Sequence, residues 1–186
     1  MGTSGLLGFI IRGVQRHAAY NHYDSYPSYL RQNTSKFIRG LTPQGHNTMA
    51  RRLREITWVD RDSTPSLEIQ HQYQRAGFAD LSVSNKSAAD WYCLLHKTQG
   101  AAALPAIYNG QLKHMAESVD LLDDCDWAYF VDFENKKLET WCGGEAVDVA
   151  TFEKLVKEGD GYMDKLLKDD HHRGEQKTNK PNSKAT

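Results

Sequence analysis

Residues 20–27, with the sequence YNHYDSYP, bring several chemically active side chains together. His22 can act as a base, because imidazole changes protonation near neutral pH. Asp24, acting with the hydroxyl of Tyr20 or Tyr26, is an alternative base, and Ser25 can accept an acyl group. These residue types suit a transfer reaction that needs a base and an acceptor. The candidate catalytic residues are therefore His22, Asp24, Tyr20, Tyr26 and Ser25.

This segment is expected at the end of a β-strand. Residues 14–23 follow an apolar run and an Arg-Gly turn, a pattern that predicts the return strand of a hairpin. Successive side chains of a strand point to opposite faces, so Ala18, Tyr20 and His22 should share one face. Pro27 and the polar turn formers before it then end the strand. An alternative interpretation is purely structural, with tyrosine rings packed along a rim and the aspartate holding the turn.

The composition is that of one ordinary globular domain. The chain has 186 residues, of which 39% are hydrophobic and 25% are charged. It contains no run of about 18 apolar residues and no signal peptide, so we expect a cytoplasmic protein that does not enter a membrane. Cys93, Cys125 and Cys142 are widely spaced, and no pattern of metal ligands accompanies them. We therefore expect free thiols, no metal site and no cofactor.

Charge is distributed unevenly along the chain. Residues 1–59 hold eight Lys and Arg against two Asp and Glu, whereas residues 115–170 hold sixteen acidic residues against six lysines. Such asymmetry indicates either a surface for a polyanion on the basic half or mutual neutralisation of the two halves within the fold. Arg51, Arg52 and Arg54 lie on a predicted helix and are the candidate nucleic-acid-binding residues. A solvated helix face is the alternative.

The periodicity of apolar residues predicts several helices. They are expected over residues 28–41, 43–57, 65–76, 87–99, 112–122 and 151–159. Asp90 is expected to cap a helix, because it comes just before an apolar helical pattern. Residues 101–109 contain Pro105 and are expected to form a connector.

The clearest hairpin is expected in the second half of the chain. Residues 127–133 and 137–142 are rich in aromatic and β-branched residues and are joined by a turn over 134–136. Gly143-Gly144 is expected to end the sheet. The whole pattern predicts an α+β fold over residues 1–167, in which an antiparallel sheet from two hairpins packs with amphipathic helices. Residues 168–186 contain no large apolar side chain and are expected to be a disordered tail.

Carboxylates of the second half are candidates for binding a cationic substrate. Glu139 and Trp141 share a strand face, and a carboxylate beside an aromatic ring attracts a guanidinium group. Asp132 and Glu134 are further candidates near the hairpin turn. The alternative for Glu139 and Trp141 is an exposed cross-strand contact.

Several motifs resemble those of a known group of proteins. A group of small fungal proteins begins with GTRGL and carries YNHxDSYP, and this chain is similar to it over most of residues 2–160. The motifs that carry the resemblance are GTSGL at 2–6, YNHYDSYP at 20–27, DWYC at 90–93 and WAYFVDFE at 127–134. The chain departs from the group at Ser4, where the group has Arg, and at Arg31, where it has Gly.

The group resembles the fungal arginine-containing cyclodipeptide synthases, which join amino acids taken from charged transfer RNAs. The resemblance implies a transferase of secondary metabolism that makes a diketopiperazine. Its partners would be aminoacyl-tRNAs, arginyl-tRNA among them, and the basic half of the chain would contact RNA phosphates. The resemblance does not assign catalytic residues, so the roles given above for His22, Asp24 and Ser25 come from their chemistry.

Two other classes of function remain open. One is a hydrolase or another small-molecule enzyme that uses His22 and Asp24. The other is a non-enzymatic interaction module with an aromatic rim. The residues of that rim would be Tyr20, Tyr23, Tyr26, Tyr29 and Trp141.

Overall fold

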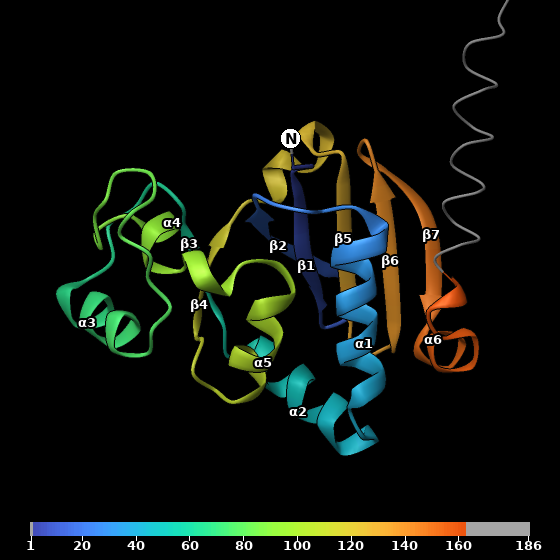
Figure 1. The fold of residues 1–186 in the computed structure, drawn as a ribbon. Coiled ribbons are helices and arrows are strands. Elements are labelled where there is room, and N and C mark those ends of the chain that lie inside the picture. Colours follow the sequence, from blue (N-terminus) through green and yellow to red (C-terminus); the bar gives the residue numbers. More distant parts are fainter. Residues whose placement is uncertain (1, 163–186) are drawn as a thin grey trace, which may run out of the picture.

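The computed structural model describes residues 2–162, which form a five-stranded sheet with helices on one face and a lobe at one edge (Figure 1). The strand order is β2-β1-β5-β6-β7. The strands are β1 (Gly5–Ile11), β2 (Gln15–Asn21), β5 (Trp127–Asp132), β6 (Lys137–Cys142) and β7 (Glu145–Thr151).

Strand β1 joins the two hairpins of the sheet. It pairs antiparallel with β2 and parallel with β5, with Gly5 opposite Trp127. Two of its residues have to be glycine, because neighbouring groups fill the space that a side chain would need. A Cβ at Gly5 would lie 2.5 Å from the carbonyl oxygen of Trp127, and one at Gly8 would lie 2.6 Å from the ring of Phe130. The centre of the sheet therefore depends on this close approach.

Helices cover one face of the sheet and bury most of its core. Their apolar side chains pack against Leu7, Phe9, Tyr129 and Val131. The helices are α1 (Gln32–Gly40), α2 (Pro43–Arg54), α5 (Ala103–Tyr108) and α6 (Phe152–Glu158), and a π-helical turn (Pro27–Arg31) leads into α1. The opposite face carries a smaller apolar cluster around Leu6, Ile10 and Phe130. It is covered in part by the 3-10 segment η4 (Val119–Asp124).

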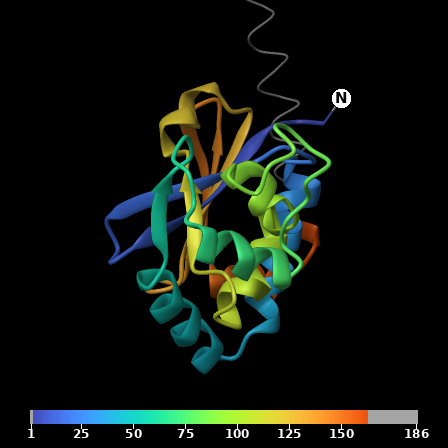
Figure 2. The same cartoon turned by 90° about the vertical axis from the view of Figure 1, so that its left-hand side faces the viewer.

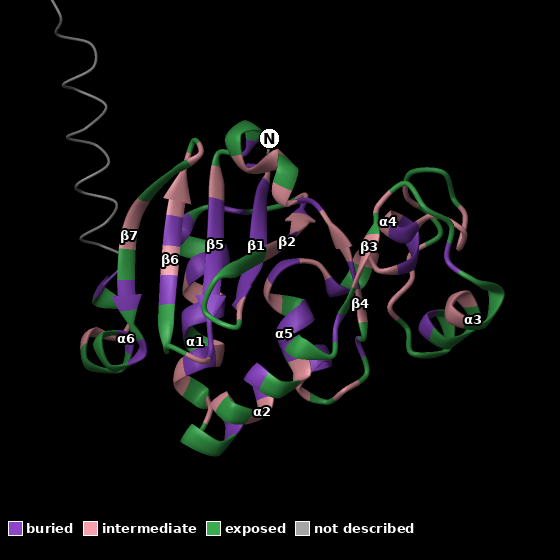
Figure 3. Cartoon of the chain, turned by 180° about the vertical axis from the view of Figure 1, so that it is seen from behind, coloured by how far each residue is buried: buried purple, intermediate pink, exposed green. Residues whose placement is uncertain are grey.

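A lobe built on a second, two-stranded parallel sheet lies beside the edge strand β2 (Figure 2). It contains β3 (Thr57–Asp60), β4 (His114–Glu117), α3 (Leu67–Arg75) and α4 (Trp91–Leu94), followed by the 3-10 segments η2 (His96–Thr98) and η3 (Gly100–Ala102). Backbone groups of Ala18 on β2 join it to the main sheet: the carbonyl accepts from the N–H of Ser118, and the N–H donates to Glu117 Oε1. Strands β1 and β5 are buried, whereas the loops around α3 and α4 are largely exposed (Figure 3).

The predicted α+β fold is confirmed, as are both hairpins. The first turns at Arg12 and Gly13, both with positive φ, and Ala18 and Tyr20 pack against the same apolar cluster, as the alternation predicts. Predicted starts of helices also hold: Thr42 and Thr151 cap α2 and α6 with their side chains, and Asp90 accepts a hydrogen bond from the N–H of Tyr92 at the start of α4.

Three predicted elements differ in the structure. Residues 112–122 were expected as a helix, but they form β4 and η4, because pairing with β3 outweighs an apolar spacing that fits either state. Residues 101–109 contain α5, in which Pro105 occupies the first turn, where its missing N–H costs no hydrogen bond. Residues 87–99 break into α4 and η2 instead of one helix.

Gly143 and Gly144 do not end the sheet. Both have positive φ and form the tight turn that leads into β7, a role that glycine serves in two-residue hairpins. Strand β7 was therefore missed by the sequence reading, as was β3. The expected tail over 168–186 lies outside the residues that the structure describes.

Arg31 is fully buried and ties the π-helical turn to the far edge of the sheet. Its Nε donates to Thr140 Oγ1 at 2.8 Å, and its Nη2 lies 3.2 Å from Asp148 Oδ2. Its guanidinium group also stacks over the ring of Tyr162 at 4.6 Å, and the hydroxyl of Tyr162 donates to Asp148. Burial lowers the pKa of Arg31 and the charge of Asp148 opposes that shift. The Asp148 carboxylate thus stabilises the buried positive charge of Arg31.

We expect Arg31→Met to destabilise the protein by about 3 kcal/mol or more, because it leaves Asp148 without its cation. Arg31→Met combined with Asp148→Leu should recover most of that loss. The matched control is Arg39→Met, which breaks the more exposed pair with Asp160 and should cost at most about 1 kcal/mol. Urea denaturation measures the free energy of unfolding of all three variants. Equal losses of stability for Arg31→Met and Arg39→Met would contradict the stabilising role of the buried network.

Candidate active site

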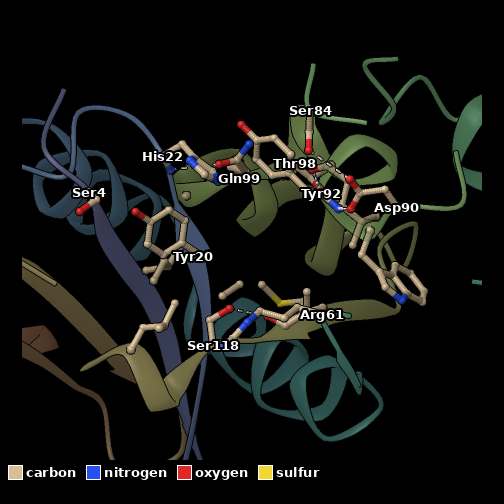
Figure 4. A pocket seen from close by; sticks show the side chains of 18 of the residues that line it. Ser4, Tyr20, His22, Arg61, Ser84, Asp90, Tyr92, Thr98, Gln99 and Ser118 are labelled. Carbon is tan, nitrogen blue, oxygen red and sulfur yellow. Dashed lines mark hydrogen bonds between the residues drawn. The ribbon is translucent and has the colours of Figure 1, made fainter. Parts of the chain in front are cut away.

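A cavity of about 640 Å³ lies between the edge strand β2 and the lobe (Figure 4). Tyr20 and His22 at the end of β2 form part of its wall. Around the rest of the wall, Figure 4 shows Gln99, Tyr92, Asp90, Arg61 and Ser118 from the lobe and its connections. A cavity of this volume can hold a small organic molecule. It is the candidate site.

His22 is held in place by a hydrogen bond to its backbone, and not by hydrogen bonds to its ring within residues 2–162. Its N–H donates to Gln99 Oε1 at 3.0 Å, and the amide nitrogen of Gln99 in turn donates to the carbonyl oxygen of His96. Gly100 lets this turn approach β2, because a Cβ there would lie 2.8 Å from Asn21 Oδ1. The backbone of His22 is thereby fixed at the mouth of the cavity.

Aromatic rings surround the imidazole of His22. The ring of Tyr20 meets it edge-on at 4.5 Å, and the ring of Tyr92 lies at 4.3 Å. Among residues 2–162, no hydrogen bond reaches either ring nitrogen of His22. Burial lowers the pKa of His22, and the nearby His96 lowers it further. A neutral imidazole with an available nitrogen is the form that can accept a proton.

Tyr92 on α4 closes this aromatic cluster. Burial raises its pKa to about 12, and its contact with Tyr23 acts in the same direction. Its hydroxyl therefore remains protonated at neutral pH. The sequence reading did not select Tyr92, because its place opposite His22 depends on the packing of the lobe against β2.

Three of the five predicted catalytic residues do not line the cavity. Ser25 is fully buried, accepts a hydrogen bond from Asn21 Nδ2 at 2.9 Å and supports the turn. Asp24 is exposed with a φ of 47°, a conformation that aspartate tolerates in turns. Tyr26 is 49% exposed just before the π-helical turn. Only Tyr20 and His22 of the predicted set therefore meet in the cavity.

The predicted substrate-binding carboxylates lie elsewhere. Asp132 is buried and accepts hydrogen bonds from the N–H groups of Glu134 and Asn135, so it holds the β5–β6 turn. Glu134 pairs with Arg54. Both lie at the end of the sheet opposite to Gly5 and the cavity, because β5 runs parallel to β1.

Glu139 and Trp141 do bind a guanidinium group, and it belongs to Arg16 of the same chain. Arg16 donates to Glu139 through Nε at 3.1 Å and through Nη2 at 2.8 Å. It also lies over the rings of Phe130 and Trp141, at 6.0 and 5.6 Å from their centroids. The position predicted for a cationic substrate is therefore filled within the fold, and it does not line the cavity.

The arginines on α2 differ in their surroundings. Arg52 pairs with Glu55, and Arg54 pairs with Glu134, whereas Arg51 is exposed and makes no ion pair with residues 2–162. More broadly, ion pairs link arginines of residues 1–59, and Arg61 just after them, to the acidic second half. They join Arg16 to Glu139, Arg31 to Asp148, Arg39 to Asp160, Arg54 to Glu134 and Arg61 to Asp120. Much of the charge asymmetry is therefore neutralised within the fold.

The cavity itself has an acidic wall. Asp62, Asp90 and Asp124 line it. Arg61 also lines it, and makes two hydrogen bonds to Asp120 at 2.6 and 2.8 Å. The carboxylate of Asp90 is further engaged by Ser84 and Asn85. The balance of charge along the wall favours a cationic ligand over an anionic one.

Comparisons with known proteins found no matching family model, curated protein or solved structure. Within residues 2–162, no helix has the length and apolar character needed to cross a membrane. No group of three or more His, Cys, Asp or Glu side chains in that part of the chain is arranged to hold a metal ion. Function is therefore inferred from the geometry of the cavity.

We expect His22 to titrate below the usual value of 6.5, as followed by the Cε1–H signal in NMR spectra. Because the folded protein binds this proton less readily than the unfolded chain, His22 should stabilise the fold above pH 6.5 and lose that contribution as the pH falls. His96→Gln should raise the titration midpoint only in part, since burial is the larger cause. A midpoint at or above 6.5 in the parent protein would contradict this account of the site.

Proposed function

We propose that the protein is an enzyme that joins aminoacyl groups delivered by transfer RNA, one of them arginyl, into a cyclic dipeptide. The observation that carries this proposal is His22, a half-buried neutral imidazole with an available nitrogen at a cavity of about 640 Å³. The motifs that resemble the arginine-containing cyclodipeptide synthases supply the substrate class. The cavity supplies the chemistry that such a reaction needs.

In the proposed reaction, the α-amine of one aminoacyl group attacks the ester carbonyl carbon of the other. His22 accepts the proton that the amine loses, and a C–N bond forms as the ester C–O bond breaks. The ribose hydroxyl of the released transfer RNA takes up that proton. A second attack of the same kind closes the ring and releases the other transfer RNA. This route is direct aminolysis, which is consistent with the burial of Ser25.

The cavity wall suits an arginyl side chain. Its carboxylates attract a guanidinium group, and the rings of Tyr20 and Tyr92 offer faces on which that group can stack. Arg61 does not oppose this, because its charge is paired with Asp120. Of the two departures from the group's motifs, Ser4 lines the cavity beside Tyr20 (Figure 4), whereas Arg31 is not part of the wall. Ser4 is therefore the departure that bears on substrate choice.

Exposed tyrosines on the segment that follows β2 suit the unpaired end of a transfer RNA. Tyr23, Tyr26 and Tyr29 are 57%, 49% and 56% exposed on the segment that follows β2. Single-stranded nucleotides bind proteins by stacking bases on aromatic rings, at about 1–3 kcal/mol per base. These rings could hold the 3′ end while its ester enters the cavity.

Expression in a heterologous host, with mass spectrometry of the small molecules formed, tests the proposal directly. Arg-containing cyclic dipeptides are expected from the parent protein. His22→Gln should reduce their formation about a hundredfold, because a positioned base contributes about 10² to 10⁴ in rate. Asp24→Asn is the matched control and should remain active, since Asp24 is exposed outside the cavity and Asn adopts the same backbone conformation.

Melting temperatures of both variants show whether a loss comes from misfolding. A stable, fully active His22→Gln protein would remove His22 as the base. Altered metabolites other than cyclic dipeptides would favour the hydrolase alternative, and unchanged metabolites would favour an interaction module.

Binding of RNA provides a second test. If α2 contacts phosphates, Arg51→Ala should weaken RNA binding and lower the salt slope more than Arg54→Ala, because Arg54 is already paired with Glu134. The triple variant of Arg51, Arg52 and Arg54 to Ala should weaken binding most, without changing the circular dichroism spectrum. Replacing Tyr26 and Tyr29 with Ala tests the stacking surface in the same assay. RNA affinity that survives all these changes would contradict both contact surfaces.

A further inference from the structure

A second histidine, His114, lines the same cavity at the start of β4. Its ring is set between two aromatic neighbours, with Trp91 stacked at 5.7 Å and 29° and Tyr73 edge-on at 5.7 Å. Trp91 is fixed in turn, because its Nε1 donates to Ser63 Oγ at 3.1 Å. The plane of the His114 ring is therefore held by packing.

Hydrogen bonds to Tyr73 determine which nitrogen of His114 carries the proton. Tyr73 is fully buried, and burial raises the pKa of its hydroxyl, which therefore stays protonated. The backbone N–H of Lys113 donates to that hydroxyl oxygen at 3.1 Å. The single proton of the hydroxyl then points to His114 Nδ1, which lies 2.6 Å away. Nδ1 must accept it.

A neutral histidine that accepts through Nδ1 carries its proton on Nε2. Burial lowers the pKa of His114, and the charge of Lys113 lowers it further, so a second proton is disfavoured. Among residues 2–162, no hydrogen bond uses Nε2. A buried Nε2 would then be a buried polar atom without a partner, and it is not one, so Nε2 is accessible. The Nε2–H group is therefore an available donor at the cavity wall.

We infer that His114 binds substrate by donating a hydrogen bond from Nε2–H to a carbonyl oxygen, and that Tyr73 is the positioning residue that fixes this tautomer. The inference rests on the proposed function, in which the acceptor is the carbonyl oxygen of an aminoacyl ester. That oxygen gains negative charge when the amine attacks, and a donor already oriented towards it stabilises this charge. His22 accepts a proton in the same step. The two histidines thus have complementary roles.

Nitrogen-15 NMR of the histidine-labelled protein at pH 7 tests the tautomer, because protonated and unprotonated ring nitrogens differ in chemical shift. His114 should be neutral, with the proton on Nε2. Tyr73→Phe should increase the share of the Nδ1–H form. Tyr108→Phe, at a partly buried tyrosine outside the cavity, is the matched control and should leave the His114 signals unchanged. A charged His114, or one with its proton on Nδ1, would overturn the inference.

L-Arginine methyl ester and agmatine test the acceptor, because they share a guanidinium group and only the first has a carbonyl. The ester should shift the His114 Nε2–H signal, and agmatine should not. No response to the ester, or equal responses to both, would overturn the binding role. In the product assay, His114→Ala should lower kcat about a hundredfold, whereas His114→Gln, which keeps an N–H donor, should retain more activity.

The two proposals fail in different ways. A selective response of Nε2–H to the ester, without any cyclic dipeptide from the parent protein, would reject the proposed function and retain the carbonyl site. Cyclic dipeptide formation by the parent protein, with full activity in His114→Ala, would retain the proposed function and reject the carbonyl site at His114. Melting temperatures of the variants show whether a lost signal reflects unfolding.

Discussion

The close contact of β1 with both of its neighbours is the constraint on which the fold depends. Gly5 leaves room for the carbonyl oxygen of Trp127 on β5, and Gly8 leaves room for the carbonyl oxygen of His17 on β2 and for the ring of Phe130 on β5. A larger residue at either position would separate strands that carry the core on both faces of the sheet. Because β2 ends beside the start of β1, this contact also sets where the segment with His22 leaves the sheet.

The candidate site lies at the junction of the five-stranded sheet and the two-stranded sheet, which contact each other along only part of β2. Strand β4 meets the edge of β2 through Ala18, Glu117 and Ser118, instead of continuing the ladder along the whole strand. The space beyond this junction is lined by aromatic rings and carboxylates and by two neutral histidines, which offer different groups to a ligand. Burial lowers the pKa of both, with His96 acting in the same direction on His22 and Lys113 on His114, and the hydrogen bond from Tyr73 places the proton of His114 on Nε2. Packing around each imidazole therefore assigns the chemistry available to it.

The sequence predicted those features that depend on local signals. The cap at Asp90, the helix starts near residues 43 and 151 and the turn at Arg12-Gly13 are predicted correctly, since each is determined by a few adjacent residues. Strands β3 and β4 could not, because four-residue strands carry too few residues to show a period and depend on partners far away in the chain. The same limit applied to the site. His22 could be selected from its motif, whereas Tyr92 and His114 reach it only through packing of the lobe.

Parallel pairing at the centre of the sheet also has a consequence for synthesis of the chain. The hairpin of β1 and β2 is synthesised before β5, the other neighbour of β1, which follows only after α1, α2, α5 and the lobe have been made. At about 5–20 residues per second, this delay is on the order of ten seconds. Throughout it, the apolar strand β1 presents an open edge to other nascent chains. We therefore expect β1 to be the segment of this protein that most needs a holding chaperone.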